Sequence, residues 1–324
     1  MAIRMPTACF TATTLDDALR LVFQEILQNG EQVKASRGPN LEIAGARVEI
    51  TDPRARLSRT ETRGKPFSCL GELCWYLAGT SSVDFVSYYL KQHYQGYPRQ
   101  GEVYGAYGPR LFNWRGIHQL ANVTRILQTK SSSRQAVIQL FDAADIAEKH
   151  EDVPCTCTIQ FLVRSGRLHM LTHMRSNDAF IGLPHDVFCF TMLQEIVASD
   201  LAVEVGTYRH MVGSLHIYES EIDAAKCFLN EGWQSSSERM PPMPAGNPWP
   251  AISTLLGAEQ QIRTGGTFDD AKLDGVDAYW ADLVGLLRVF RCRKDNDLEG
   301  IKATRERMSS RVYFPFIDRL AQSP

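Results

Sequence analysis

A long apolar segment constrains this chain more than any other feature. The segment is opened by Leu183-Pro184 and runs to about Ser199, which predicts a long apolar helix. Two strands are expected just before it, at residues 157–164 and 167–174, and Ser165-Gly166 between them is typical of a hairpin turn. Strands and helices are therefore mixed without strict alternation along the chain. This pattern favours the α+β class.

The remaining pattern predicts further helices towards both ends of the chain. Residues 14–29 carry one apolar face after Thr14, which can cap a helix, and Gly30 follows as a stop signal. The other expected elements are short strands with a mobile arm at 31–65, a buried helix at 68–78, a strand at 135–142, a loop or insertion at 240–250 and helices near 277–310. A chain of 324 residues with 44% hydrophobic composition can bury one large core or two modest ones.

Composition excludes several classes of protein. The net charge of −2 gives no basic surface field, so we expect no nucleic-acid partner, although a few arginines can still hold a small anion. The 8 cysteines are irregularly spaced in a large chain, which argues against a disulfide framework. The start of the chain has no signal-peptide pattern, and no stretch reaches the roughly 18 apolar residues of a membrane span. We therefore expect a cytoplasmic protein with no membrane partner.

Cys155 is the first candidate for chemistry. It follows Pro154 and enters a predicted strand, and a thiolate there is a good nucleophile if nearby cations lower the thiol pKa. Taken alone, a buried core cysteine is the more common interpretation. Cys157 on the same strand suggests a metal pair with His169 or His173, but the usual zinc spacing is absent, so we expect no metal.

Other polar residues each allow a functional and a structural interpretation. Arg175-Ser176 suits a phosphate, although a single arginine is by default solvated. Asp186 follows Pro184 in a predicted first helical turn, where an acid favours the helix dipole whatever the function. His216 and Tyr218 share a strand face and suit a sugar hydroxyl, or are ordinary half-buried residues. Glu72 lies inside an apolar helix, either on an exposed stripe or buried for acid–base work.

The order and spacing of these residues resemble the thymidylate synthase family. The motifs that carry the resemblance are Glu72-Leu73-x-Trp75-x-Leu77-x-Gly79, Tyr104-Gly105, Pro154-Cys155 with Gln160-Phe161, Arg175-Ser176-x-Asp178-x-Phe180-x-Gly182-Leu183-Pro184, Glu204-Val205-Gly206 with His210, and His216-x-Tyr218. The similarity covers most of residues 14–228. It implies the thymidylate synthase fold, a mixed sheet flanked by helices, in one catalytic domain over residues 1–324. From about residue 230 onward the chain is atypical.

The resemblance also implies a role for each matching residue. Cys155 would add to C6 of a pyrimidine nucleoside monophosphate, and C5 would then attack the methylene of the co-substrate 5,10-methylenetetrahydrofolate. The other implied roles are proton and water handling by Glu72, a substrate-side turn at Tyr104, phosphate binding by Arg37, Arg175 and Ser176, ribose binding by His216 and Tyr218, and reduced-folate contacts at Asp178 and Gly182. Arg134 would reach the phosphate from a second subunit, which implies a homodimer whose sheets pack back to back.

The chain departs from the family at the base-binding position. Thymidylate synthases have Asn where this chain has Asp186, and an amide pairs with both O4 and N3–H of uracil. Cytosine offers an amino donor at N4 and an unprotonated N3. A carboxyl group can accept from that amino group and share a proton with N3, and the family's cytidylate hydroxymethylase branch has Asp here.

Further departures concern the shield around the reacting carbon. Thr156 replaces the usual His, Ser214 replaces a usual Asp, the segment before Tyr104 reads SYYLKQHYQGYPRQ instead of being tryptophan-rich, and the chain ends RVYFPFIDRLAQSP without the usual hydrophobic tail. Water then becomes the expected terminal nucleophile. The predicted product is a 5-hydroxymethyl nucleotide with release of tetrahydrofolate.

The prediction is thus a cytidylate 5-hydroxymethylase, most similar to the CMP hydroxymethylases of mildiomycin-type nucleoside antibiotic biosynthesis. The residues do not report a 2′-hydroxyl, so CMP and dCMP both stay open as substrates. One alternative is a thymidylate synthase that methylates dUMP. An alternative from another class is a nucleotide-binding protein that kept the pocket and lost catalysis.

Overall fold

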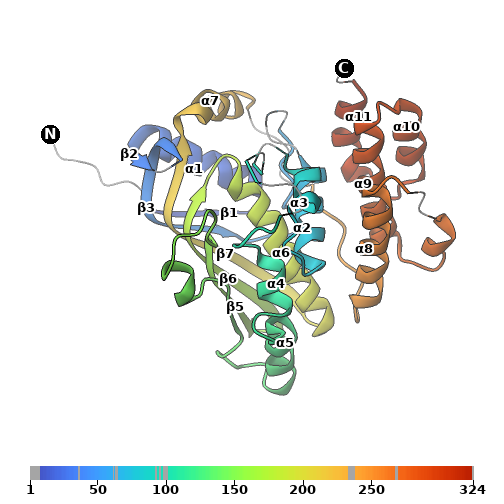
Figure 1. Cartoon of the computed structure of the whole chain (residues 1–324), viewed down its shortest axis with the longest axis horizontal. Coiled ribbons are helices and arrows are strands. Elements are labelled where there is room, and N and C mark those ends of the chain that lie inside the picture. The colour runs from blue at the N-terminus through green and yellow to red at the C-terminus, as the bar shows by residue number, and fades with distance from the viewer. Residues whose placement is uncertain are drawn as a thin grey trace.

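The computed structural model describes residues 8–35, 37–60, 62, 65–91, 93–94, 96–97, 101–232, 238–266 and 269–322. Its centre is a mixed sheet with strand order β1-β3-β7-β6-β5-β4, and β2 pairs with β3 at one end. The strands are β1 (Cys9–Ala12), β2 (Glu31–Ala35), β3 (Gly38–Ile50), β4 (Val137–Gln139), β5 (Thr156–Arg164), β6 (Arg167–Asp178) and β7 (Glu204–Tyr218). The expected α+β class and the mixed sheet flanked by helices are confirmed (Figure 1).

The predicted hairpin lies at the centre of this sheet. β5 and β6 are antiparallel, and both turn residues, Ser165 and Gly166, adopt positive φ angles of 50° and 72°. Such angles match the twist of the two strands. β6 and β7 are parallel, and a parallel pair requires a crossover connection. Helix α6 (Gly182–Asp200) supplies it.

α6 is the helix expected from the apolar segment, and it is the most buried element of the fold. Every side chain from Leu183 to Ser199 is buried, because the sheet strands β6 and β7 lie on one side of it and α2 (Pro66–Leu77) on another. A helix that is apolar all round is stable only in such surroundings. The helix begins at Gly182, so Asp186 lies beyond the first turn, and the predicted first-turn position was wrong.

The N-terminal half contains one strand longer than expected. α1 (Leu15–Asn29) begins after Thr14, whose side chain accepts a hydrogen bond from the Asp17 amide, as predicted. The following region was predicted to form short strands, but β3 has 13 residues and pairs with β7 along most of its length. The remaining helices here are α3 (Val83–Tyr89), α4 (Tyr107–Phe112), α5 (Gln119–Thr129) and α7 (Ile222–Asn230), with 3₁₀ turns at Ala143–Ile146 and Glu219–Glu221.

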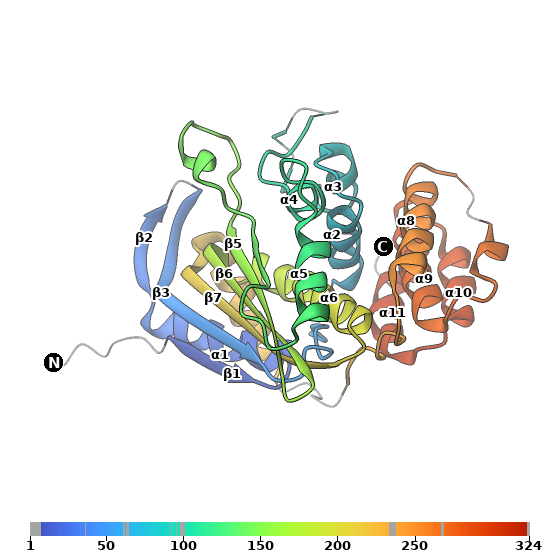
Figure 2. The same ribbon diagram turned by 90° about the horizontal axis from the view of Figure 1, so that it is seen from below.

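The C-terminal region forms a block of helices beside α2 (Figures 1 and 2). Its helices are α8 (Trp249–Arg263), α9 (Ala278–Lys294), α10 (Leu298–Arg307) and α11 (Phe314–Gln322), with 3₁₀ turns at Asp270–Leu273 and Arg311–Tyr313. The Tyr279 hydroxyl lies 3.5 Å from the Met192 sulfur, which joins α9 to α6. None of the helices in the described residues is long and apolar enough to cross a membrane.

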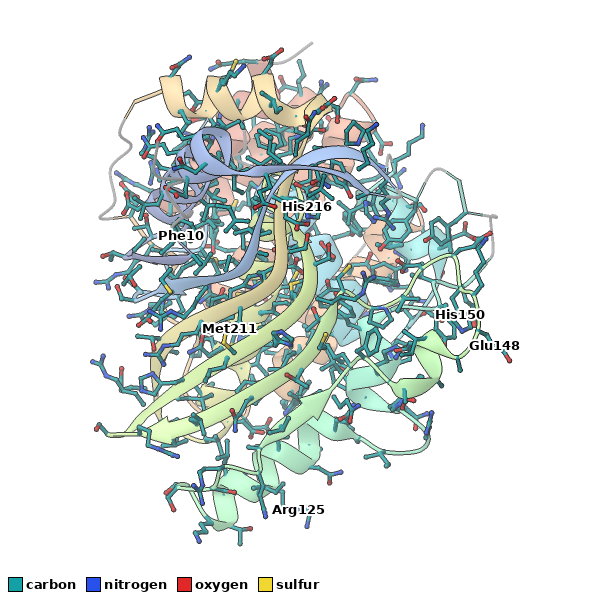
Figure 3. All side chains as sticks on the ribbon, turned by 90° about the vertical axis from the view of Figure 1, so that its left-hand side faces the viewer. Phe10, Arg125, Glu148, His150, Met211 and His216 are labelled. Atoms are coloured by element: carbon teal, nitrogen blue, oxygen red, sulfur yellow. The ribbon has the colours of Figure 1, made fainter. Side chains whose placement is uncertain are left out.

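One side of the sheet is free of helices among the described residues. α1, α2 and α6 lie on the opposite side, and Figure 3 looks onto the open side, where β5, β6 and β7 face the viewer. Leu162, Leu171 and Met211 on these strands are only half-buried. Apolar side chains on both faces are typical of a sheet whose second face packs against another layer.

Candidate active site

Cys155 lies immediately before β5 and is fixed there by Arg175. The Cys155 carbonyl oxygen accepts a hydrogen bond from the Arg175 amide (2.8 Å). The Arg175 guanidinium donates to the carbonyl oxygens of Pro154 (3.0 Å) and Val153 (2.8 Å). Burial raises the pKa of the Cys155 thiol, while the charge of Arg175 opposes that shift. The ligand-free site therefore holds Cys155 as a half-buried thiol next to a cation.

The second cysteine of this strand has a different setting. The Cys157 carbonyl accepts hydrogen bonds from the amides of Leu140 and Phe141, and burial raises the pKa of its thiol. The sequence also suggested His169 as a metal partner of this cysteine. Its Nδ1 atom lies 2.9 Å from the Thr207 hydroxyl oxygen. Within the described part of the chain, no three His, Cys, Asp or Glu side chains gather as a metal site requires.

Glu72 forms a buried ion pair with a histidine that the sequence analysis did not single out. Glu72 Oε2 lies 2.7 Å from His185 Nδ1, and Glu72 Oε1 accepts a hydrogen bond from the Tyr76 hydroxyl (2.7 Å). Burial alone would lower the pKa of His185, but Cys69 and the Glu72 carboxylate outweigh it and raise that pKa to about 10. Burial likewise opposes the charge of Glu72, yet His185 and Tyr76 hold the Glu72 pKa below its ordinary value. Glu72 is thus an ionised carboxylate.

Asp186 is buried in the same pocket but is not paired with a cation. Its Oδ2 accepts a hydrogen bond from Asn177 Nδ2 (2.7 Å), and the residue is 8% exposed. Burial, and then the negative charge of Glu72, raise the pKa of Asp186 well above its ordinary value. The negative charge of Asp186 also contributes to raising the pKa of the Cys155 thiol. The pKa values of the two carboxyl groups are thus pushed in opposite directions, that of Glu72 down and that of Asp186 up.

A cavity of about 500 Å³ adjoins this pocket. It is lined by Arg37, His93, Gly96, Tyr97 and Glu151. The Arg37 guanidinium lies 3.7 Å from Asp152, and both groups influence the Cys155 thiol. The Arg37 side chain is 55% exposed, so the guanidinium can turn to meet an incoming anion. His93, Gly96 and Tyr97 belong to the segment 87–100, whose residues 92, 95 and 98–100 lie outside the described residues.

The predicted sugar- and folate-side residues lie along β6 and β7. The ring of buried His216 packs edge-on against Tyr218, with 4.8 Å between ring centroids. Asp178 Oδ1 accepts hydrogen bonds from the amides of Phe180 (2.8 Å) and Ile181 (3.2 Å), so Asp178 shapes the turn into α6. Gly182 begins that helix. Their roles towards sugar and folate remain predictions.

The remaining predicted residues are Tyr104, Arg134 and Ser176. The Tyr104 ring is stacked on His150 with centroids 3.6 Å apart, and Tyr104 is 40% exposed. The Tyr107 hydroxyl instead reaches the nucleophile strand, where it accepts hydrogen bonds from the Thr156 amide (3.1 Å) and hydroxyl (2.9 Å). Arg134 is exposed on this protomer, and Ser176 is half-buried on β6.

Sequence analysis missed three residues that contact the predicted ones, Tyr107, Asn177 and His185, and it named His210 without its contact to Asn177. His185 directly precedes Asp186 and Asn177 directly precedes Asp178, so each was adjacent to a residue already singled out. The sequence signal for these residues was a polar side chain at a position expected in the core, because a buried polar group nearly always has a hydrogen-bond partner.

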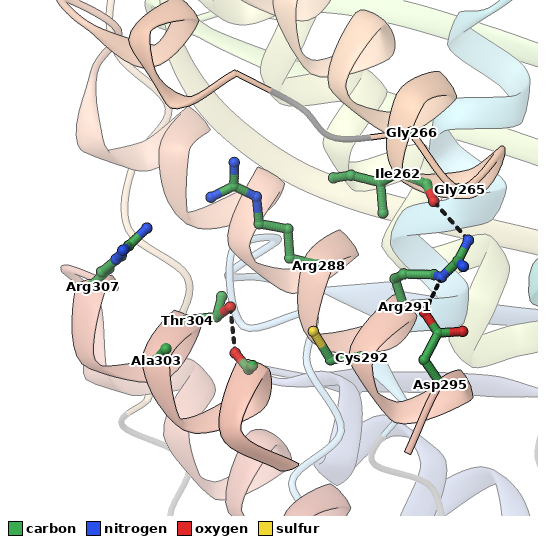
Figure 4. Close-up of a pocket in the computed structure, with 11 residues that line it drawn as sticks. Ile262, Gly265, Gly266, Arg288, Arg291, Cys292, Asp295, Ala303, Thr304 and Arg307 are labelled. Atoms are coloured by element: carbon green, nitrogen blue, oxygen red, sulfur yellow. Dashed lines mark hydrogen bonds and ion pairs between the residues drawn. The ribbon is translucent and has the colours of Figure 1, made fainter. Parts of the chain in front are cut away.

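A second cavity, of about 400 Å³, lies apart from this site in the C-terminal block (Figure 4). It is lined by side chains of α8, α9 and α10, among them Arg288, Arg291 and Arg307. Arg291 forms an ion pair with Asp295 at its wall. None of the predicted site residues lines this cavity.

The Glu72–His185 pair makes a prediction for stability. His185→Leu leaves Glu72 buried without its cation, and losing one partner of such a pair costs about 3–5 kcal/mol in unfolding free energy at pH 7. The His185 pKa is raised above its unfolded value of 6.5, so its contribution is complete below pH 6.5 and is lost as the pH rises through about 10. Urea titrations between pH 6 and pH 10 should therefore show the difference from the wild type shrinking.

Ser68→Ala is the control for this prediction. It removes the 3.3 Å contact between the Ser68 hydroxyl and His185 Nε2, together with the 3.3 Å hydrogen bond from that hydroxyl to the Lys65 carbonyl, and should cost much less. A His185→Leu effect that is equally large at pH 6 and pH 10 would show that packing, not charge, makes the contribution.

Comparison with known proteins agrees with this geometry. Residues 20–241 match the family model described as thymidylate synthase. Among solved structures, thymidylate synthase from T4 phage superposes with a TM-score of 0.57 and 22% sequence identity, covering 67% of this chain and 81% of that chain. That likeness shows a shared fold, and the family match spans well over half of the chain. The chain therefore belongs to the thymidylate synthase family, whose enzymes transfer a one-carbon unit from methylenetetrahydrofolate to a pyrimidine nucleotide.

Proposed function

We propose that this protein is a cytidylate 5-hydroxymethylase acting on CMP, or on dCMP. The observation that carries the proposal is the setting of Asp186, a buried carboxyl group that accepts a hydrogen bond from the neutral Asn177 amide (2.7 Å) and whose pKa is raised by burial and by the charge of Glu72. A neutral carboxyl group offers one donor and one acceptor side by side. Those groups complement the unprotonated N3 and the N4 amino group of cytosine.

Cys155 and Asp186 then act in one step. The Cys155 sulfur forms a bond to C6 of the base, and the electron pair of the C5–C6 double bond moves towards N3. Asp186 supplies the proton that N3 takes up, which lowers the energy of the charged transition state. Arg175 holds the loop that carries Cys155, so it positions the sulfur as well as offering positive charge.

The 500 Å³ cavity, whose lining includes Arg37, would receive the nucleotide phosphate, and the reduced folate is the second substrate of this proposal. Methylenetetrahydrofolate supplies the one-carbon unit at the oxidation level of formaldehyde, which needs no external oxidant or reductant. Asp178 and Gly182 stand at the start of α6, beside the base pocket, as the folate-side residues of this proposal. C5 attacks the methylene carbon, C5 loses its proton, and the bond from the methylene carbon to the folate nitrogen breaks, which releases tetrahydrofolate. Water then adds to the exocyclic methylene carbon, the bond from Cys155 to C6 breaks, and the N3 proton returns to Asp186, which leaves the 5-hydroxymethyl product and the free thiol.

The surroundings of the reacting carbon support water as the last nucleophile. Thr156 is engaged by Tyr107, and the Ser214 hydroxyl is bonded to Glu42. α11 at the described C-terminal end packs on α9 and α10, and Arg319 of α11 donates to the Thr60 carbonyl (2.7 Å). Thr156, Ser214 and α11 are thus engaged in these contacts. In this proposal they do not keep water away from the exocyclic methylene carbon, so water can attack it.

The phosphate site and the open sheet face support a homodimer. Arg37, Arg175 and Ser176 lie near Cys155 on one protomer, whereas exposed Arg134 is the residue proposed to reach a neighbouring site. The helix-free face of β5, β6 and β7 carries half-buried apolar side chains (Figure 3). Packing two such faces back to back would bury them. The ribose would then lie against His216 and Tyr218.

The nucleophile can be tested directly with tritium at C5 of CMP. Cys155→Ala should abolish tritium release and turnover but leave nucleotide binding nearly unchanged, because only the bond to C6 is lost. Cys157→Ala is the matched control on the same strand and should remain active. A wild-type protein that binds CMP without releasing tritium would instead be a catalytically inactive nucleotide-binding protein.

The shared phosphate site can be tested by mixing inactive variants. Arg134→Ala and Arg175→Ala should each lose most activity. A hybrid dimer of the two has one site that keeps both arginines, so mixing should restore activity. Light scattering should show a dimer. Two inactive variants that fail to complement after subunit exchange, or a fully active monomer, would contradict the shared site.

Base preference tests Asp186 and separates hydroxymethylase from thymidylate synthase. Asp186→Asn can donate to O4 and accept from N3–H, so the preference should shift towards uridylate by about tenfold to a hundredfold, as expected for one unpaired buried polar group. The measurement is kcat/KM for CMP, dCMP, UMP and dUMP, with product mass and dihydrofolate absorbance. If the ratios of kcat/KM between cytidylate and uridylate did not change, Asp186 would have only a structural role. If the wild type formed dihydrofolate from dUMP, the protein would be a thymidylate synthase.

A further inference from the structure

A buried polar chain leads away from Asp186 into the core. Asn177 Nδ2 donates to Asp186 Oδ2 (2.7 Å), and Asn177 Oδ1 lies 2.9 Å from His210 Nε2. His210 Nδ1 lies 2.7 Å from the Tyr208 hydroxyl. His210 and Tyr208 are each 0% exposed, and Asn177 is 5% exposed. The chain therefore ends in the interior, and only its Asp186 end faces the substrate pocket.

The hydrogen bonds of this chain run in one direction. Asn177 uses its amino group on Asp186, so its carbonyl oxygen must accept from His210 Nε2–H. His210 Nδ1 is then the unprotonated nitrogen and accepts from the Tyr208 hydroxyl. Burial lowers the pKa of His210 to about 3, which agrees with a neutral ring carrying one proton. Asn177 and His210 thus each have one fixed donor and one fixed acceptor, and Tyr208 is the donor at the inner end.

This direction determines which oxygen of Asp186 can carry a proton. Oδ2 accepts from the Asn177 amide, so a proton on Asp186 resides on Oδ1. We propose that Asn177, His210 and Tyr208 are positioning residues that fix this donor–acceptor order and thereby select cytosine, an inference that rests on the proposed cytidylate specificity. Cytosine pairs with Oδ1–H through N3 and with Oδ2 through its N4 amino group.

Uracil presents the opposite order, a donor at N3 and an acceptor at O4. It would have to turn over to satisfy the same two oxygens. The bond from Cys155 to C6 and the anchored phosphate prevent that rotation. A carboxyl group free to exchange its two oxygens would accept either base, whereas one held by the amide accepts one order only.

The start of α6 is shaped to admit the amide. A Cβ atom at Gly182 would lie 2.8 Å from Asn177 Nδ2 and 3.7 Å from Asp186 Oδ2. The first distance is shorter than a side chain tolerates, so a larger residue at position 182 would push the Asn177 amide aside. Gly182 is therefore needed for the link between Asn177 and Asp186, in addition to its expected place beside the folate.

The test compares two variants that each replace a buried amide by Leu. Asn177→Leu removes the link to Asp186, and the ratio of kcat/KM for CMP over UMP should fall by about tenfold or more. Gln194→Leu is the control: Gln194 on α6 is 0% exposed, and its amide donates to the Leu168 carbonyl (2.8 Å) and not to Asp186. It should lower stability and leave the CMP/UMP ratio unchanged.

Tyr208→Phe provides a milder change that removes only the hydroxyl group. The ratio should then fall to a value between the wild type and Asn177→Leu, since His210 loses the bond that fixes its tautomer. If a variant has no measurable turnover, the ratio of dissociation constants for CMP and UMP takes the place of kcat/KM. An unchanged ratio in both Asn177→Leu and Tyr208→Phe would overturn the inference.

The wild-type ratio separates this inference from the proposed function. A wild type that prefers UMP would refute the cytidylate assignment and, with it, the selection of cytosine by the chain. A wild type that prefers CMP, with a ratio unaffected by either chain variant, would leave the cytidylate assignment standing and remove the role of Asn177, His210 and Tyr208.

Discussion

Two carboxyl groups, Glu72 and Asp186, are buried in one pocket, and a low-dielectric site cannot hold both as anions at small cost. The protein meets this constraint by giving them different partners. Glu72 has the His185 imidazolium and the Tyr76 hydroxyl, whereas Asp186 has the neutral Asn177 amide. The pKa of Glu72 is consequently lowered and that of Asp186 raised, and such a separation of two carboxyl pKa values is what acid–base chemistry requires.

α6 makes this division possible with consecutive residues. Neighbouring residues on a helix point about 100° apart, so His185 turns towards α2 and Glu72 while Asp186 turns towards β6 and Asn177. Since α6 is buried along its length, neither side chain can escape to solvent. The buried helix thus sets the electrostatics of the site as well as the packing of the core.

Local patterns predicted the elements of this fold well. The apolar segment that became α6, the Thr14 cap of α1 and the Ser165-Gly166 turn all depend on residues close in sequence. The length of β3 was not predicted, because its 13 residues are held by pairing with β7, far along the chain. Tertiary pairing overrides local propensity in strands.

The site was predicted only in part for the same reason. Cys155, Glu72 and Asp186 were found as members of a family pattern. The link from Glu72 to His185 joins residues 113 apart, and the link from Asn177 to His210 joins residues 33 apart. No local periodicity reports such contacts. The sequence analysis therefore named the reacting groups but missed the residues that set their protonation.

The pairing of β3 with β7 also bears on how the protein acquires activity as it is made. Asn40 pairs with Tyr218, so the central sheet cannot close until most of the chain has left the ribosome. Folds dominated by such distant pairings form slowly, because the loop entropy is lost before the contacts stabilise the chain. Glu72, Cys155 and Asp186 precede β7 in the sequence, whereas His210 lies on it. The nascent chain is thus expected to complete the link from His210 to Asn177, and with it the polar chain behind Asp186, in a late step.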